Sequence, residues 1–202
     1  MLKELVVATR NHGKLKEIRA VLADTVARVR PASDFPDFPE TIEDGATFAR
    51  NALKKAREAV SFTGLPALAD DSGLAVDALD GAPGVFSARF AGEGADDAAN
   101  NRRLLAEMKD IPPERRQAAF ICVMAFVTPG GAEQLFTGRV GGRIILEGRG
   151  GEGFGYDPLF LVDGFDRTMA ELALEEKNRI SHRGQALRLF RDYLAQERLN
   201  LK

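Results

Sequence analysis

Two adjacent aspartates follow an apolar run, in Asp70-Asp71-Ser72-Gly73 after residues 65–69. The run predicts a strand that ends in polar residues. Successive strand side chains point to opposite faces, so the two carboxylates cannot both be buried along one face. One carboxylate can hold a metal ion while the other orients backbone or water. The same four residues are also typical of a plain turn, and on this segment alone both interpretations stay open.

Acidic residues in a second segment extend this metal hypothesis. Residues 31–45 are spaced by prolines and rich in acids, which predicts an extended loop. Proteins usually bind Mg²⁺ with one or two carboxylates, and substrate phosphates and waters complete the shell. Glu40 and Glu43 are therefore the candidates for a second ligand, and the sequence leaves both open.

A candidate anion site follows the first apolar run of the chain. Thr9, Asn11 and Lys14 stand where a strand turns into a helix. Free N–H groups and the helix dipole attract anions at such a turn, so a hydroxyl, an amide and an ammonium would complete a phosphate cradle. Only Gly13-Lys14 matches a P-loop, since Leu15 replaces its metal-binding Ser or Thr. A polar turn with a solvated lysine is the alternative.

The glycine-rich second half contains a third candidate. Ten of the 20 glycines fall in residues 130–155, which excludes a packed helix and predicts loops that bring backbone close to a ligand. The segment Gly153-Phe154-Gly155-Tyr156-Asp157-Pro158 sets two rings and a carboxylate beside glycines. Aromatic faces stack on flat rings and a carboxylate accepts from a ring N–H, so the segment suits a nucleobase. A glycine-rich turn with core aromatics is the alternative.

Cations near the C-terminus form the last candidate. Lys177, His182 and Arg183 stand ahead of a predicted helix or in its first turn. Cations there oppose the helix dipole, which is easier to explain if they reach an anion or a carbonyl. The chain has two histidines, so a His-based metal site is not expected. No G-x-S-x-G motif supports Ser–His–Asp hydrolysis.

The apolar pattern predicts the elements that position these residues. Strands are expected at residues 5–8, 25–30, 65–69 and 158–162, and a hairpin at 117–127 and 134–140. Helices are expected around 15–22, between an N-cap at Thr47 and a stop at Gly64, over 96–109, and from 181 to 194. Strand–helix alternation followed by a hairpin predicts an α/β fold with a mixed sheet.

Composition narrows the function classes. The 202 residues are 45% hydrophobic and 29% charged, as in a soluble globular chain. A net charge of −2 removes the usual reason to propose nucleic-acid binding. No apolar run approaches the roughly 18 residues of a membrane span, and the start lacks a signal-peptide pattern, so we expect a cytoplasmic protein. The single cysteine, Cys122, lies in an apolar run that predicts a buried structural thiol.

Six motifs appear in order along the chain. They are Thr9-x-Asn11-x-x-Lys14, Glu43-Asp44-Gly45-x-Thr47-Phe48-x-x-Asn51-Ala52-x-x-Lys55-Ala56, Ala69-Asp70-Asp71-Ser72-Gly73-Leu74, Gly81-Ala82-Pro83-Gly84-Val85-Phe86-Ser87-Ala88-Arg89, Gly153-Phe154-Gly155-Tyr156-Asp157-Pro158 and Ser181-His182-Arg183-Gly184-Gln185-Ala186-Leu187. Together they closely resemble the inosine triphosphatase family of non-canonical purine nucleoside triphosphate pyrophosphatases, in its bacterial form. The resemblance runs from about residue 5 to 194.

This resemblance implies a function and an architecture. The family hydrolyses dITP, ITP and XTP to the monophosphate and pyrophosphate with Mg²⁺, and so removes deaminated purines from the nucleotide pool. The implied protein is a homodimer without nucleic-acid or membrane partners. The implied fold is one α/β domain over residues 1–202, with a long mixed central sheet flanked by helices and a cleft between two lobes.

The resemblance also implies roles for individual residues. Asp71 would be the general base or metal-bound carboxylate that activates water, with Glu43 or Glu40 as the second metal ligand, and Ser72 would contact substrate. The triphosphate would be bound by Thr9, Asn11, Gly13, Lys14, Lys55 and Lys177, and by the backbone of Arg10 and His12. The base pocket would be formed by Phe154, Gly155, Tyr156, Asp157, His182 and Arg183.

Base selection is expected at the purine 6-position. Arg183 donating to the 6-oxygen of hypoxanthine or xanthine would reject ATP, because its donors would meet the 6-amino donor of adenine. GTP keeps the 6-oxo group, and nothing in the sequence shows how it would be excluded.

Overall fold

The computed structural model describes residues 2–200, with side chains through residue 197. The chain divides into two compact units. Unit 1 comprises residues 1–71, 122–138 and 183–202, and unit 2 comprises residues 72–121 and 139–182. Residues 1, 201 and 202 of the predicted single domain lie outside the described residues.

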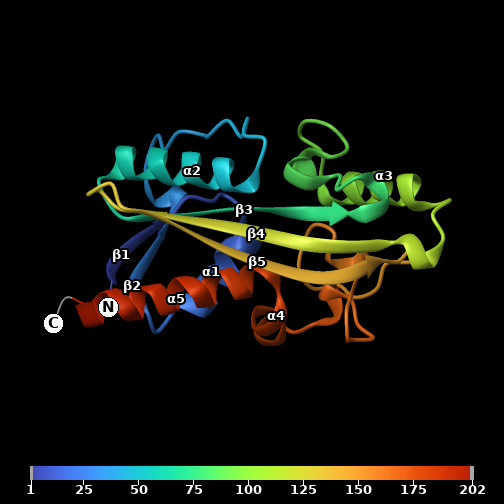
Figure 1. Cartoon of the computed structure of the whole chain (residues 1–202). Coiled ribbons are helices and arrows are strands. Elements are labelled where there is room, and N and C mark those ends of the chain that lie inside the picture. Colours follow the sequence, from blue (N-terminus) through green and yellow to red (C-terminus); the bar gives the residue numbers. More distant parts are fainter. Residues whose placement is uncertain (1, 201–202) are drawn as a thin grey trace. The chain divides into compact units, whose positions relative to one another are not determined.

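Six strands in the described residues form one sheet in the order β2-β1-β3-β4-β5-β6 (Figure 1). They are β1 (Leu2–Val7), β2 (Val26–Pro31), β3 (Ala67–Val76), β4 (Gln117–Val127), β5 (Glu133–Ile144) and β6 (Phe160–Val162). The α-helices are α1 (His12–Leu22), α2 (Phe48–Thr63), α3 (Asp97–Met108), α4 (Leu174–Ile180) and α5 (His182–Asn200). Because β1 pairs in parallel with β2 and β3 while β6 pairs antiparallel with β5, the predicted mixed α/β sheet is confirmed.

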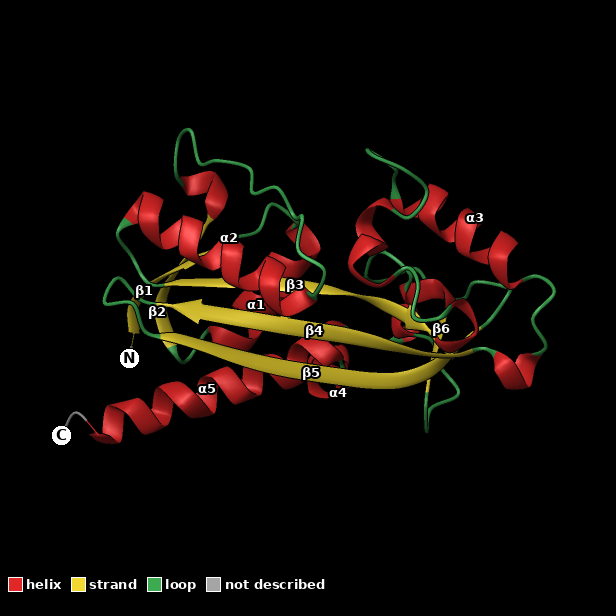
Figure 2. Ribbon diagram, turned by 45° about the horizontal axis from the view of Figure 1, so that its top comes forward, coloured by secondary structure: helices red, strands yellow, loops and turns green. Residues whose placement is uncertain are grey.

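Strand pleating divides the core of unit 1 into two apolar layers. Leu68 of β3 packs in the layer with α1 and α5, whereas Ala67 and Ala69 pack in the layer with α2. Figure 2 shows α2 on one side of β3 and α5 on the other. The same alternation puts Asp70 on the α1/α5 face and Asp71 on the α2 face. Both aspartates are buried. Asp70 meets Arg183 of α5 and Asp71 meets Asn51 of α2, so the prediction that they occupy opposite faces is confirmed.

The strand predicted to end at residue 69 is longer than expected. β3 continues through both aspartates and Gly73 to Val76, so of the two interpretations left open for this segment the plain turn is wrong. Residues such as Asp, Ser and Gly favour a turn where their polar groups must stay in contact with water. Here the carboxylates find polar partners in the helices on either face, and the strand can remain buried.

Capping fixes the helix ends. Thr47 Oγ1 accepts from the backbone N–H of Arg50 at 3.2 Å, and Gly64 ends α2 in the left-handed conformation with its N–H bonded to Val60 O. Both follow the sequence prediction for α2. Asn11 caps α1 in the same way, since its Oδ1 accepts from the N–H of Lys14 at 3.0 Å.

The second half departs from prediction at three places. α4 was not expected, and β6 is shorter than expected because Asp157–Leu159 forms a 3₁₀ turn before it. β5 continues through Gly141 and Gly142, which were expected in a loop near ligand. A Cβ at Gly142 would overlap the carbonyl oxygen of Leu161 and lie 2.5 Å from Phe160 Cζ. Because glycine has no side chain, β6 can pair with β5 at this position.

Two further expectations concern burial and membranes. Cys122 is a buried free thiol, as predicted. Within residues 2–200, no helix combines the length and the apolar character that crossing a membrane requires.

Gly142→Ala should lower the free energy of unfolding by about 2 kcal/mol, because the new methyl group must push β6 away. Gly130→Ala is the control: its Cβ would meet only Thr128 Oγ1, at 3.8 Å, so a change within about 0.5 kcal/mol is expected. Urea unfolding measures both. Equal effects of the two substitutions would contradict the packing role of Gly142.

Candidate active site

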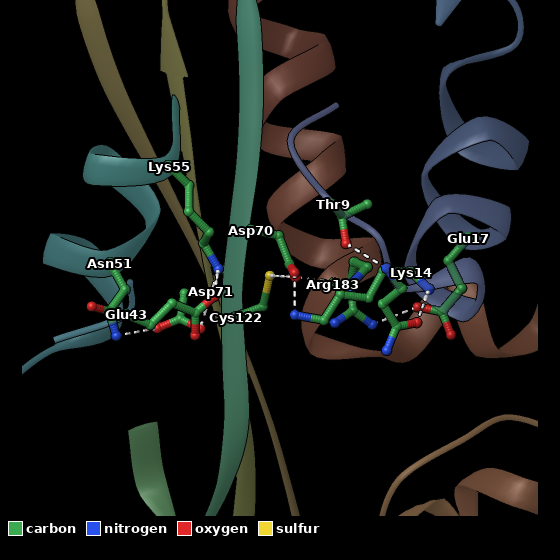
Figure 3. A network of polar contacts seen from close by, with 11 residues as sticks. Thr9, Lys14, Glu17, Glu43, Asn51, Lys55, Asp70, Asp71, Cys122 and Arg183 are labelled. Atoms are coloured by element: carbon green, nitrogen blue, oxygen red, sulfur yellow. Dashed lines mark hydrogen bonds and ion pairs between the residues drawn. The ribbon is translucent and has the colours of Figure 1, made fainter. Parts of the chain in front are cut away.

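Asp70 lies at the centre of a buried charge network on the α1/α5 face of β3 (Figure 3). Lys14 Nζ forms an ion pair with its Oδ1, and Arg183 Nε donates to its Oδ2 at 3.0 Å. The Cys122 thiol also donates to Oδ2, at 3.3 Å. Arg183 Nη1 in turn donates to Glu17 at 2.6 Å. Two cations and two carboxylates from β3, α1 and α5 thus compensate one another.

The protonation of this network follows from its charges. Burial by itself raises the pKa of Asp70, but the positive charges of Arg183 and Lys14 outweigh burial and hold this pKa well below its usual range. Burial lowers the pKa of Arg183, and the charges of Asp70 and Glu17 more than reverse that effect. Asp70 and Arg183 therefore stay ionised at neutral pH, and losing either one leaves uncompensated charge in the core.

Asp71 faces a different set of groups on the α2 side of the strand (Figure 3). Asn51 Nδ2 donates to its Oδ2 at 3.0 Å, and Lys55 Nζ lies 3.6 Å from its Oδ1. The same ammonium donates to Glu43 Oε1 at 2.6 Å. Two carboxylates therefore converge on one buried cation.

The pKa of Asp71 shifts in the opposite direction from that of its neighbour. Burial raises the pKa of Asp71, the charge of Glu43 adds to the rise, and Lys55 opposes it only in part. Adjacent carboxyls whose environments push their pKa values apart are typical of sites that divide structural and proton-transfer roles.

The donor set of Glu43 and Asp71 fits Mg²⁺. Both are hard oxygen donors, and their convergence on Lys55 shows that the protein brings them to one cation. No cluster of three or more His, Cys, Asp or Glu side chains suited to a metal occurs in the part of the chain that the structure describes. Phosphate and water oxygens would therefore complete the shell. Glu40 lies elsewhere: its side chain is 82% exposed and pairs with Arg10 at 3.8 Å.

The predicted phosphate turn is organised around the start of α1. Thr9 Oγ1 accepts from the N–H of Asn11 at 3.1 Å, and the Asn11 side chain caps the helix. These side chains support the turn, and the N–H groups of His12 and Gly13 belong to the first helical turn, where intrahelical acceptors are absent. A surface cavity of about 420 Å³ adjoins this turn, and Arg10 and His12 are among its lining residues.

The segment predicted to bind the base forms a tight turn in unit 2. Gly153 and Gly155 have φ of 81° and 62°, and a Cβ at Gly153 would overlap the Asp157 carboxylate. Asp157 Oδ2 accepts from the N–H of Phe154 at 2.9 Å and from Lys177 Nζ at 2.5 Å. Lys177 Nζ also lies 4.9 Å from the centre of the Phe154 ring. The ring, the carboxylate and the ammonium therefore form one group.

The remaining predicted residues lie on β3, α4 and α5. Lys177 stands in the last turn of α4, where the helix dipole favours a cation, so the expectation that it opposes a dipole is wrong. The buried His182 ring stacks on Phe120 with centroids 4.9 Å apart. Ser72 follows Asp71 in β3. Direct contact of Arg183 with a base stays a prediction, since the structure shows its guanidinium bound to two carboxylates.

Sequence reasoning missed two α3 side chains that hold the base segment. Asp97 Oδ2 accepts from the N–H of Gly155 at 2.6 Å, and Asn101 Nδ2 donates to the carbonyl of Gly155 at 2.9 Å. The two residues are four apart, so they share a helix face. Tyr156 is held separately, because its hydroxyl donates to Ser87 O at 2.8 Å. The spacing was visible in the sequence, but its target was not.

The chain matches proteins of known family over nearly its whole length. The model of the Ham1 family matches residues 5–193. A Geobacter sulfurreducens protein named dITP/XTP pyrophosphatase is 58% identical over 193 residues, covering 96% of this chain and 97% of the relative. A Desulfotalea psychrophila protein of the same name is 51% identical, covering 93% and 83% respectively.

Solved structures give the same result. The structure of a HAM1 protein from Coxiella burnetii superimposes with a TM-score of 0.87 at 45% identity, covering 97% of this chain and 100% of that one. The structure of a nucleoside-triphosphatase, dITP/XTP pyrophosphatase, from Mycobacterium abscessus has a TM-score of 0.75 at 51% identity, covering 93% and 98%.

The two aspartates should respond oppositely to the same isosteric change. Asp70→Asn removes the carboxylate that Lys14 and Arg183 share. It should therefore lower the free energy of unfolding by about 3 kcal/mol at neutral pH. Asp71→Asn removes a charge that burial disfavours, so stability should be unchanged or higher. Urea unfolding of the metal-free variants measures both, and equal losses would contradict the assignment.

The Asp70 effect should also depend on pH. Because the folded-state pKa of Asp70 is depressed, its stabilising contribution is fully present above the unfolded-state pKa of about 3.9 and is lost as the pH falls through the folded-state pKa. The stability difference between wild type and Asp70→Asn should thus hold steady above about pH 5 and shrink in stronger acid. A difference that grows on acidification would show that another group is responsible.

Proposed function

The chain belongs to the Ham1 family, as its ordered motifs predicted, and from this premise we propose that it hydrolyses dITP, ITP and XTP to the nucleoside monophosphate and pyrophosphate. The name dITP/XTP pyrophosphatase, carried by several relatives at 50–58% identity, supports this substrate class. The structural observation that carries the proposal is the convergence of Asp71 and Glu43 on Lys55. Such a group suits the activation of water beside a polyphosphate.

Asp71 and Glu43 would hold Mg²⁺ in this protein. The chemistry that the ion supplies when bound is neutralisation of phosphate charge and activation of water. Glu43 is preferred to Glu40 because Glu43 shares a cation with Asp71, whereas Glu40 is exposed and pairs with Arg10.

The reaction adds water to phosphorus and breaks the anhydride between the α- and β-phosphates. Asp71 is the proposed acceptor of the water proton, and a raised pKa improves a carboxylate as a base near neutral pH. Lys55 and the N–H groups at the start of α1 compensate phosphate charge. Phosphoryl transfer asks a protein mainly for this positioning and neutralisation.

Base recognition is assigned to Phe154 and Asp157, with His182 and Arg183 as further candidates. Lys177, which the family resemblance assigned to the triphosphate, is assigned here to the base because it pairs with Asp157. Lys177 Nζ and the Asp157 carboxylate supply a donor and an acceptor beside the Phe154 ring. Purines with a 6-oxo group need a donor at that position, whereas adenine presents a 6-amino donor. This difference supports a preference for deaminated purines over ATP.

The proposal includes two further expectations. We expect a homodimer, which light scattering on the purified protein measures. We also expect a cytoplasmic enzyme, since its substrates arise in the nucleotide pool.

A product assay tests the function. ITP, dITP, XTP, GTP and ATP are incubated with the protein and Mg²⁺, and pyrophosphate is separated from orthophosphate. Pyrophosphate from the first three, with little from GTP and ATP, is expected. Orthophosphate as the product would identify a different phosphohydrolase, and absence of turnover would indicate a nucleotide-binding protein without catalysis.

Asp71→Asn should abolish pyrophosphate release while nucleotide binding survives, because it removes the proton acceptor and preserves the shape of the side chain. Turnover is compared with wild type, and IMP binding is measured by calorimetry. Near-normal turnover would show that Asp71 is not the base.

A further inference from the structure

Asn51 is a buried side chain that the proposed mechanism leaves without a role. It belongs to the Thr47-Phe48-x-x-Asn51 motif and lies on α2 one turn before Lys55, on the same helix face. Its side chain is fully buried. It therefore acts only on protein groups around it.

The Asn51 amide joins two segments that are far apart in sequence. Its Nδ2 donates to Asp71 Oδ2 at 3.0 Å, and its Oδ1 accepts from the backbone N–H of Gly45 at 2.7 Å. A carboxylate can only accept and a backbone N–H can only donate, so these partners fix one orientation of the amide. The Asp71 oxygen that Asn51 leaves aside, Oδ1, is the one nearer Lys55.

The Gly45 end of this link is also specific. A Cβ at Gly45 would overlap Asn51 Oδ1, so glycine is needed for the backbone to come so close. Gly45 is two residues from Glu43. Lys54, three residues after Asn51 in α2, holds the same loop, since its Nζ donates to Ile42 O and to Asp44 Oδ1, each at 2.8 Å. Side chains of α2 therefore hold the loop on both sides of Glu43.

We propose that Asn51 is a positioning residue that sets the Glu43 loop and the Asp71 carboxylate at a fixed separation, so that both reach one cation and one water. This inference rests on the proposed function, because it assigns Asn51 to the same site. One hydrogen bond limits rotation of the carboxylate, and the other holds the loop. A displacement of about 1 Å in such a group can cost about 100-fold in rate.

The kinetic test uses Asn51→Asp. This variant keeps an oxygen for the Gly45 N–H and replaces the donor to Asp71 with a second acceptor. We expect kcat for ITP to fall about 100-fold and KM to change less than about threefold, because a buried side chain gives no direct binding to substrate. An unchanged kcat, or a raised KM at unchanged kcat, would overturn the positioning role.

Arg57→Gln is the matched control on the same helix. Arg57 pairs with Glu133 on β5 through two bonds of 2.6 Å, and it is exposed. Its loss breaks polar contacts of α2 without touching the Glu43 loop or Asp71, so kcat should stay within about twofold of wild type. Urea unfolding of each variant confirms that the assayed protein is folded.

A second measurement needs neither substrate nor metal. The Gly45 amide resonance is followed by NMR in wild type, Asp71→Asn, Asn51→Ser and the double variant, all metal-free. Asp71→Asn should move the Gly45 resonance through the Asn51 amide, and in the Asn51→Ser background it should not. An unmoved resonance, or an equal shift in both backgrounds, would overturn the link. Failure of the proposed function would instead show as absence of pyrophosphate from wild type.

Discussion

The buried ion pairs of Asp70 are the interaction on which unit 1 depends. One carboxylate on β3 receives Lys14 from α1 and Arg183 from α5, and Arg183 also binds Glu17 of α1. Burial of the charged side chains of Asp70, Arg183 and Glu17 is costly unless each meets an opposite charge. The network therefore fixes how both helices lie against the strand, and places the start of α1 where phosphate binding is proposed.

The neighbouring Asp71 shows the opposite use of a carboxylate. Burial raises the pKa of Asp71 and Lys55 offsets the rise only in part, so the ionised form of Asp71 is less favourable in the folded protein than in the unfolded chain. A raised pKa makes a carboxylate a better proton acceptor near neutral pH, whereas it would weaken a carboxylate that stabilises the fold by its charge. The alternation of strand side chains makes the division of roles workable, because the two charges occupy opposite faces of one strand. Stability is assigned to one residue and reactivity to the next.

Polar side chains of unit 2 hold the backbone of the proposed base segment. The peptide of Gly155 is bound at both its N–H and its carbonyl by side chains of α3. Lys177 and the N–H of Phe154 fix Asp157. Gly153 and Gly155 have positive φ in this compact turn. Glycine adopts this conformation without strain, and other residues do not. A rigid segment of this kind suits discrimination between similar bases, because a mismatched polar group cannot be relieved by movement.

Local chemistry explains what the sequence by itself determined. The ends of α2 depend on a hydroxyl and a glycine within one turn of the helix, and the opposite orientation of Asp70 and Asp71 depends on the strand period alone. The ordered motifs identified the family. Tertiary structure alone decided that β3 continues through the aspartates, that Glu43 and not Glu40 joins Asp71, and that Asn51 links them. These outcomes depend on partners 12 to 113 residues away, and the energy of a buried charge is set by such partners, which no local pattern specifies.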